Sequence, residues 1–173
     1  MTTEFIDHNW EKHYTLKEND VYVEAGAYKG VYGKIASLKG CKVILIEPNP
    51  DNIELISKNL ESIKLKNVTI VYSAVGSKKG NTRTSFHEAS VNTLDDILEH
   101  LKIKCVDLLC CDIEGSEIDM IKGSHNYFSQ RKIKNVALAC YHRPEYHKNA
   151  IDILNNYGFK NLVYEEGVVY GNI

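Results

Sequence analysis

The sequence has no marked excess of charge of either sign. Its 21 lysines and arginines are balanced by 23 aspartates and glutamates, so the formal net charge is -2. A protein that binds nucleic acid through a strongly basic surface needs more positive charge than this. The composition therefore disfavours nucleic acid as a partner, although it does not exclude a local basic patch.

Long hydrophobic runs are also missing. No apolar run reaches the roughly 18 residues that are needed to span a bilayer, and we expect no signal peptide at the start of the sequence. The five cysteines are odd in number, and none lies in a Cys-x-x-Cys pair, which excludes a zinc knuckle or a disulfide framework as the simplest reading. Cys110, Cys111 and Cys140 lie in apolar runs and are expected in the core. We therefore expect a cytoplasmic protein without a membrane segment.

The chain does contain enough apolar material for one core, with 43% hydrophobic residues among 173. Apolar runs alternate with amphipathic segments, and several runs are apolar on both faces, as in a parallel sheet covered by helices on both sides. The predicted strands are Asp20–Ala25, Cys41–Glu47, Val68–Ser73, Cys105–Cys111, Asn135–Tyr141, Lys160–Tyr164 and Gly167–Tyr170. The predicted helices are Val31–Leu38, Pro50–Ile63, Leu94–Leu101, Ser116–Ile121 and Tyr146–Tyr157. This alternation predicts an α/β, doubly wound, Rossmann-like fold.

Three further segments complete the predicted organisation. The last two strands are separated only by the turn in "VYEEGVVY", so we expect the sheet to end in an antiparallel hairpin. The polar segment Gly76–Ser90 fits either a loop or a short edge strand. Residues 1–19 fit either an amphipathic helix that covers the sheet edge or a lid over the site. Residues 20–173 are then expected to form a single domain.

The stretch "VYVEAGAYKG", residues 21–30, reads as a strand that runs into a glycine turn. Dinucleotide folds use Gly-x-Gly-x-x-Gly, in which the second glycine lets the backbone approach a pyrophosphate. Tyr28 stands in that place, and its side chain would obstruct the approach. The turn therefore suits a nucleoside without phosphate better than a dinucleotide, and S-adenosylmethionine is a ligand of that kind.

Two acids agree with this cofactor. Glu24 precedes the turn, where it can face the ammonium group or the cationic sulfur of S-adenosylmethionine but would repel a pyrophosphate. Glu47 ends the second predicted strand, about where nucleoside-binding folds place the acid that binds the ribose diol. A carboxylate can accept hydrogen bonds from both hydroxyl groups there. The two acids together with the glycine turn predict a site for S-adenosylmethionine.

Several sequence blocks point to a known family. They are "VYVEAGAYKG", "LIEPNPDNIELISKNL", "VYSAVGSKKG", "VNTLDDIL" and "VDLLCCDIEGSEIDMIKG", in this order along the chain. The series, from about Val21 to Gly123, resembles the FkbM-type family of S-adenosylmethionine-dependent methyltransferases. The family loop usually reads Asp-x-Gly-Ala-Asn-x-Gly, so Glu24 replaces its acid and Tyr28 its asparagine.

The resemblance implies a seven-stranded class I methyltransferase sheet, mostly parallel with a C-terminal antiparallel hairpin and helices on both faces. It also implies that Ser73 and Ala74 lie near the adenine of the cofactor. The predicted cofactor-binding residues are Glu24, Gly26, Ala27, Tyr28, Gly30, Glu47, Pro48, Asn49, Ser73, Ala74 and Asp112.

The stretch "CCDIEGSE" places the acids Asp112, Glu114 and Glu117 after the fourth large strand, at the sheet edge where doubly wound folds bind ligands. A turn at Gly115 explains the glycine but not acids at both 112 and 114. Methyl transfer requires an aligned acceptor, and an alcohol acceptor also needs a base within hydrogen-bond reach. Asp112 and Glu114 are therefore candidate catalytic residues.

His142 follows the next strand in "ACYHRPEYH" and should reach the same edge of the sheet, as a general base across from Asp112. Arg143 could instead orient an anionic substrate. The predicted catalytic set is thus Asp112, Glu114 and His142. The three acids could hold Mg²⁺, but we expect no metal, because carboxylates beside a sulfonium have an electrostatic use of their own.

The favoured function is methylation of a hydroxyl group on a small molecule or glycan. The alternatives are a protein or RNA methyltransferase, and a nucleoside-binding protein that keeps the fold without catalysis. The identity of the acceptor and the oligomeric state cannot be read from the sequence.

Overall fold

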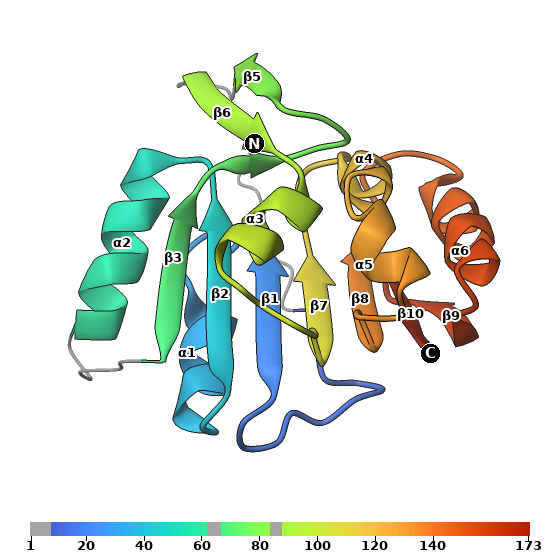
Figure 1. Ribbon diagram of the computed structural model, residues 1–173, viewed down its shortest axis with the longest axis horizontal. Helices are drawn as coiled ribbons and strands as arrows, with labels where there is room; N and C mark the ends of the chain where they lie inside the picture. The colour runs from blue at the N-terminus through green and yellow to red at the C-terminus, as the bar shows by residue number, and fades with distance from the viewer. Residues whose placement is uncertain (1–7, 62–66, 84–87) are drawn as a thin grey trace.

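The computed structural model describes residues 8–61, 67–83 and 88–173, and its centre is a seven-stranded sheet (Figure 1). The strands are β1 (Val21–Ala25), β2 (Lys42–Glu47), β3 (Val68–Tyr72), β7 (Leu108–Cys111), β8 (Asn135–Ala139), β9 (Lys160–Glu165) and β10 (Val168–Asn172). Their order is β3-β2-β1-β7-β8-β10-β9. β10 runs antiparallel to both of its neighbours, and the strands from β3 to β8 are parallel. The predicted sheet is confirmed.

Helices cover both faces of this sheet. They are α1 (Val31–Leu38), α2 (Pro50–Glu61), α3 (Leu94–His100), α4 (Glu117–Lys122), α5 (His125–Ser129) and α6 (Tyr146–Asn156). The side chain of Thr93 accepts a hydrogen bond from the backbone N–H of Asp96 and so caps α3. The sequence did not predict α5, which is too short to show a helical period. The last two residues predicted for α2, 62 and 63, lie outside the described residues.

Two layers of core explain why the strands are apolar on both faces. Alternate strand residues such as Val23, Ile44 and Leu109 pack with the buried residues of α3, α4, α5 and α6. The intervening residues pack with α1 and α2 on the opposite face. Figure 1 shows α3 in front of the sheet and α1 behind it. Cys110, Cys111 and Cys140 are buried, as predicted.

The carboxyl-terminal strands form the expected hairpin. The turn between β9 and β10 consists of Glu166 and Gly167, both with positive φ angles. Two-residue turns of this hand match the twist of the flanking strands, and glycine adopts them without strain. The predicted strand Cys105–Cys111 is shorter in the structure, because Val106 makes only an isolated bridge to Ile133 before β7 begins.

A second, three-stranded sheet stands above the carboxyl ends of the large one (Figure 1). It consists of β4 (Ala74–Val75), β5 (Gly80–Arg83) and β6 (Glu88–Asn92). β5 pairs antiparallel with β6, and β4 pairs parallel with it. The polar segment Gly76–Ser90 is thus more ordered than a loop, although residues 84–87 lie outside the described part of the chain.

Residues 8–16, called the N-terminal strap below, cross the α1 face of the sheet. They contain turns and bends, so the amphipathic helix expected for residues 1–19 is absent from residues 8–19, and residues 1–7 lie outside the described range. Trp10 and Leu16 are buried in the core of that face, and the hydroxyl group of Tyr170 donates to the carbonyl of Asn9. The strap therefore packs on the α1 face of the sheet, and the role of residues 1–19 as a lid stays a prediction.

No helix among residues 8–61, 67–83 and 88–173 is both long and apolar enough to cross a bilayer.

Candidate functional site

The carboxyl ends of β1 and β7 lie side by side, because Ala25 pairs with Cys111 in the parallel register. The chain leaves β1 at Gly26, whose φ is +83°. A Cβ atom at Gly26 would lie 1.8 Å from the backbone carbonyl oxygen of Asp112. The glycine is therefore required both for its left-handed backbone and for the close approach of the two chain segments.

Asp112 is the centre of a polar cluster at this edge. Its Oδ1 lies 2.8 Å from Nε2 of His142, and its Oδ2 lies 3.0 Å from Nε2 of His8. The hydroxyl group of Tyr141 donates to Oδ2 at 3.1 Å. The predicted neighbours Asp112 and His142 are thus brought together, while His8 and Tyr141 are partners that the sequence reasoning missed. The sequence pointed to these two residues only through their places in the chain: Tyr141 is next to His142, and His8 lies in the aromatic N-terminal segment.

The charges in this cluster depend on one another. Burial works against ionisation of Asp112, but the hydrogen bonds from His142 and His8 outweigh it and hold the pKa of Asp112 well below its ordinary value. Burial likewise works to lower the pKa of His142, yet the hydrogen bond to Asp112 and the charge of Glu117 raise it above its ordinary value. Asp112 is therefore ionised at neutral pH, and His142 has an enhanced tendency to take a proton.

The turn after Asp112 places the two acids that follow it, Glu114 and Glu117, in different surroundings. Glu114 has a left-handed backbone, and its side chain is 90% exposed, with Oε2 3.6 Å from Nδ1 of His142. Glu117, at the start of α4, has a wholly buried side chain. Its Oε1 accepts hydrogen bonds from the backbone N–H groups of Ile113 and Gly115. Burial raises the pKa of Glu117, against the effect of these hydrogen bonds.

The glycine turn and the end of β2 form a second polar group, centred on Glu47. Oε2 of Glu47 accepts from the backbone N–H of Tyr28, and Oε1 accepts from the backbone N–H of Asn49 and the side-chain amide of Asn52. A carboxylate has about four acceptor positions, so room for one more donor remains. Glu47 thus joins the turn after β1 to the start of α2. Pro48, between them, is half-buried.

Other predicted cofactor residues flank this group. Gly30 has a φ of +69° and, like Ala27, is buried, whereas the Tyr28 side chain is exposed. Ser73 is buried; its Oγ donates to the carbonyl of Ala74. The side chain of Ser73 therefore connects β3 to the small sheet, and contacts of this stretch with a nucleoside stay a prediction.

Glu24 occupies a different environment from the one expected. Its side chain lies on the α1 face of the sheet and is buried, with Oε2 lacking a hydrogen-bond partner among the described residues. Burial raises the pKa of Glu24 to about 8, and the negative charge of Asp112 adds to the shift. Glu24 is therefore mostly neutral at pH 7, and its predicted contact with a cationic ligand stays a prediction.

Comparison with known families identifies this arrangement. The model of the FkbM methyltransferase domain matches residues 24–160, which include the glycine turn, Glu47, Asp112 and His142. The chain belongs to the FkbM methyltransferase family. It is an S-adenosylmethionine-dependent methyltransferase domain, as the sequence blocks predicted.

Solved structures share the fold of this FkbM domain at low sequence identity. Precorrin-6y C5,15-methyltransferase from Geobacter metallireducens aligns with a TM-score of 0.60 and 16% identity, over 90% of this chain and 79% of that one. Fibrillarin from Aeropyrum pernix, in complex with natively bound S-adenosyl-L-methionine, aligns with a TM-score of 0.58 and 12% identity, over 90% of this chain and 67% of that one. These likenesses support the Rossmann-like class I fold.

A curated protein also shares sequence with the FkbM domain. Protein NETWORKED 1A of Arabidopsis thaliana is 32% identical over 111 residues, which make up 64% of this chain. The match spans only 6% of the length of that protein.

The residues of this FkbM domain fit its cofactor, S-adenosylmethionine. Glu47 accepts three hydrogen bonds, which leaves one acceptor position on its carboxylate, and its contact with a ribose hydroxyl stays a prediction. Asp112, which is ionised and adjoins Gly26, supplies negative charge suited to a cationic ligand. These groups lie at the carboxyl ends of β1, β2 and β7, the edge at which doubly wound sheets bind nucleosides.

Proposed function

We propose that this FkbM domain methylates a hydroxyl group of a small molecule or glycan. The observation that carries the proposal is the hydrogen-bonded pair of His142 and Asp112, 2.8 Å apart at the ligand-binding edge of the sheet. A hydroxyl acceptor must lose its proton as it is methylated, and such a pair supports that loss.

The two residues have different roles in this proposal. His142, whose pKa is raised, takes the proton of the acceptor hydroxyl. Asp112 stays ionised, orients the imidazole ring and stabilises the imidazolium that forms. When bound, the cofactor supplies a methyl group on a positively charged sulfur. The chain therefore has to align the hydroxyl with that methyl group and remove one proton.

Exposed aromatic rings support an acceptor with a flat or ring-shaped framework. Tyr28, Tyr72 and Tyr141 are 43%, 52% and 36% exposed and follow or end β1, β3 and β8, at the carboxyl edge of the sheet. Tyrosine rings offer an apolar face and a hydroxyl tip, which suits sugars and aromatic alcohols. The net charge of -2 gives no such support to RNA.

The proposal is tested by incubating the purified chain with S-adenosylmethionine and panels of sugars, glycans and phenolic or aliphatic alcohols. We expect release of S-adenosylhomocysteine and a product that is heavier by one methylene group, with the new methyl group on oxygen. Methylation of protein or RNA alone would favour the alternative acceptors. Cofactor binding measured by calorimetry, without methylation of any acceptor, would favour a domain that only binds the nucleoside.

A further inference from the structure

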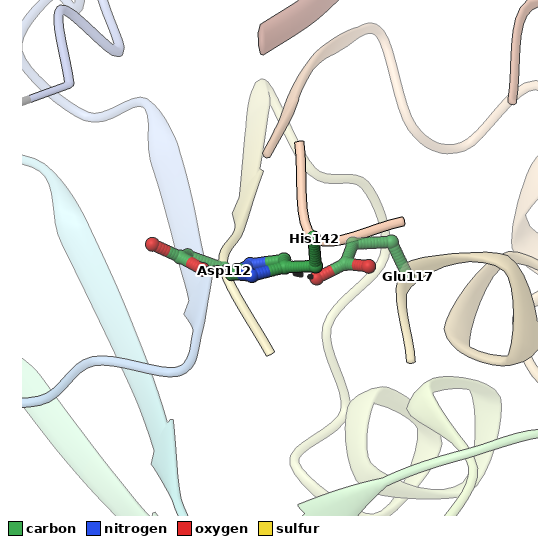
Figure 2. A group of neighbouring side chains, drawn as sticks. All are labelled: Asp112, Glu117 and His142. Atoms are coloured by element: carbon green, nitrogen blue, oxygen red, sulfur yellow. Dashed lines mark hydrogen bonds and ion pairs between the residues drawn. The ribbon is translucent and has the colours of Figure 1, made fainter. Parts of the chain in front are cut away.

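The carboxylates around His142 exceed the hydrogen bonds that the imidazole ring can donate to them. Nε2 of His142 lies 2.8 Å from Oδ1 of Asp112 and 3.6 Å from Oε1 of Glu117. Figure 2 shows the ring between these two carboxyl groups, with that of Glu117 directed toward it. One N–H group cannot serve both acids well. Backbone N–H groups donate to Oε1 of Glu117, but no group among the described residues donates to its Oε2.

The missing hydrogen-bond donor is energetically unfavourable because Glu117 is buried. Its side chain has no exposed surface, and its Oε2 has no hydrogen-bond partner among the described residues. A buried carboxyl oxygen without a partner is rare in folded proteins, because its desolvation is not compensated. Oε1, the oxygen 3.6 Å from Nε2 of His142, already accepts two backbone hydrogen bonds, so a cation bound by the carboxyl group through Oε2 would make up for the missing donor.

The spacing of the three side chains suits a metal ion. One ligand atom from each of Asp112, Glu117 and His142 lies within 4.8 Å of the other two. Two ligands at about 2.1 Å from a shared cation lie roughly 3 to 4 Å apart. We propose that Asp112, Glu117 and His142 form a binding site for a divalent cation of the Mn²⁺ or Zn²⁺ type, which accepts mixed nitrogen and oxygen ligands.

His8 would support such a site without being one of the three ligands. It binds Oδ2 of Asp112, whereas Oδ1 is the oxygen that faces His142. Groups that hold the second oxygen of a ligating carboxylate orient it toward the metal. Cation binding would thus depend on the position of the N-terminal strap, through the contact of His8 with Asp112.

The site deepens the proposed function, on which its catalytic role rests. A bound cation would contact the acceptor oxygen and lower the pKa of the hydroxyl group. The proton would then pass to solvent, and His142 would be a ligand rather than the proton acceptor. Cation binding itself can be measured without cofactor or acceptor, so it can fail or succeed independently of methyl transfer.

The test is a titration of the metal-stripped chain with Mn²⁺, followed by electron paramagnetic resonance, and with Zn²⁺, followed by equilibrium dialysis. We expect one bound ion per chain and at least a tenfold loss of affinity in Glu117→Gln and in His142→Gln. Glu114→Gln is the matched control, because Glu114 lies in the same turn but is exposed. It should bind the ion with unchanged affinity.

Histidine resonances of the wild-type chain give a readout that does not depend on a variant's folding. Mn²⁺ should broaden the imidazole signals of His142 and His8 more strongly than those of His100, His125 and His147. Absence of binding at millimolar Mn²⁺ and Zn²⁺, or equal broadening of all these signals, would overturn the site. Methyl transfer that persists with a chelator would then leave the proposed function standing without the metal.

Discussion

Glu24 and Asp112 lie near the carboxyl ends of neighbouring parallel strands, yet their carboxyl groups have opposite properties. Asp112 meets two histidines and a tyrosine, and its pKa lies well below its ordinary value. Glu24 lies within β1, faces the α1 side of the sheet, and has a pKa of about 8. Asp112 lies just after its strand, where side chains that donate hydrogen bonds can reach it, and Glu24 lies inside its strand, where it is buried. The surroundings of each carboxyl group, rather than its residue type, therefore decide which one is charged.

The largest expected effect is the loss of catalysis when the charged acid is neutralised. Asp112→Asn should lower kcat/KM for methyl transfer about a thousandfold, or about 4 kcal/mol in the barrier. It should also lower the pKa of His142, measured by NMR titration, because the hydrogen bond and charge that raise it are lost. A variant that keeps full activity would place the chemistry elsewhere.

Neutralising Glu24 should act on stability, with an effect that grows as pH rises from about 4.5 to about 8. Folded Glu24 keeps its proton up to about pH 8, whereas in the unfolded chain it ionises near 4.5. The unfolded state therefore binds fewer protons between these values, and the free energy of unfolding falls as pH rises through that window. Glu24→Gln should abolish this loss.

Urea unfolding at pH 5 and pH 9 measures the effect. The Glu24→Gln chain should resemble the wild type at pH 5 and be more stable at pH 9, by on the order of 3 kcal/mol. Glu99→Gln, at an exposed position of α3, is the control and should show no such divergence. An equal effect of Glu24→Gln at both pH values would contradict an elevated pKa.

Gly26 fixes the distance between the two strand ends, and its replacement should disturb both acids. Gly26→Ala places a Cβ atom against the carbonyl oxygen of Asp112 at a left-handed backbone position. We expect a loss of about 2 kcal/mol in unfolding free energy and weaker binding of S-adenosylmethionine by calorimetry. Gly80→Ala should change neither, since a Cβ there has open space.

The smallest effect concerns the support that Asp112 receives from the N-terminal strap. His8→Ala removes one hydrogen bond to an ionised carboxylate and should cost about 1 kcal/mol in unfolding free energy. His13→Ala breaks an exposed pair with Glu165 and a tilted ring contact with Tyr170, and should cost less than His8→Ala. Equal costs for the two variants would show that the His8 contact is no stronger than a surface pair.

The sequence predicted which side chains would gather at one edge of the sheet, because these residues lie at or after the ends of strands whose order could be inferred, whereas their roles stay predictions. All reach one edge of the parallel strands: Gly26 after β1, Glu47 at the end of β2, Asp112 after β7 and His142 after β8. His8 could not be placed in the same way. Its position depends on how residues 8–16 pack against the sheet, and no period or turn signal specifies that packing.

By itself, the sequence determined the layer architecture, the terminal hairpin and the edge of the sheet at which the polar side chains gather, because hydrophobic periodicity and turn residues are local properties. Only the tertiary structure decided which acid would be charged. The two histidines that hold Asp112 come from chain positions 8 and 142, and the burial of Glu24 depends on what covers β1. Burial and partner charges set a pKa, and both arise from residues that are distant in the sequence.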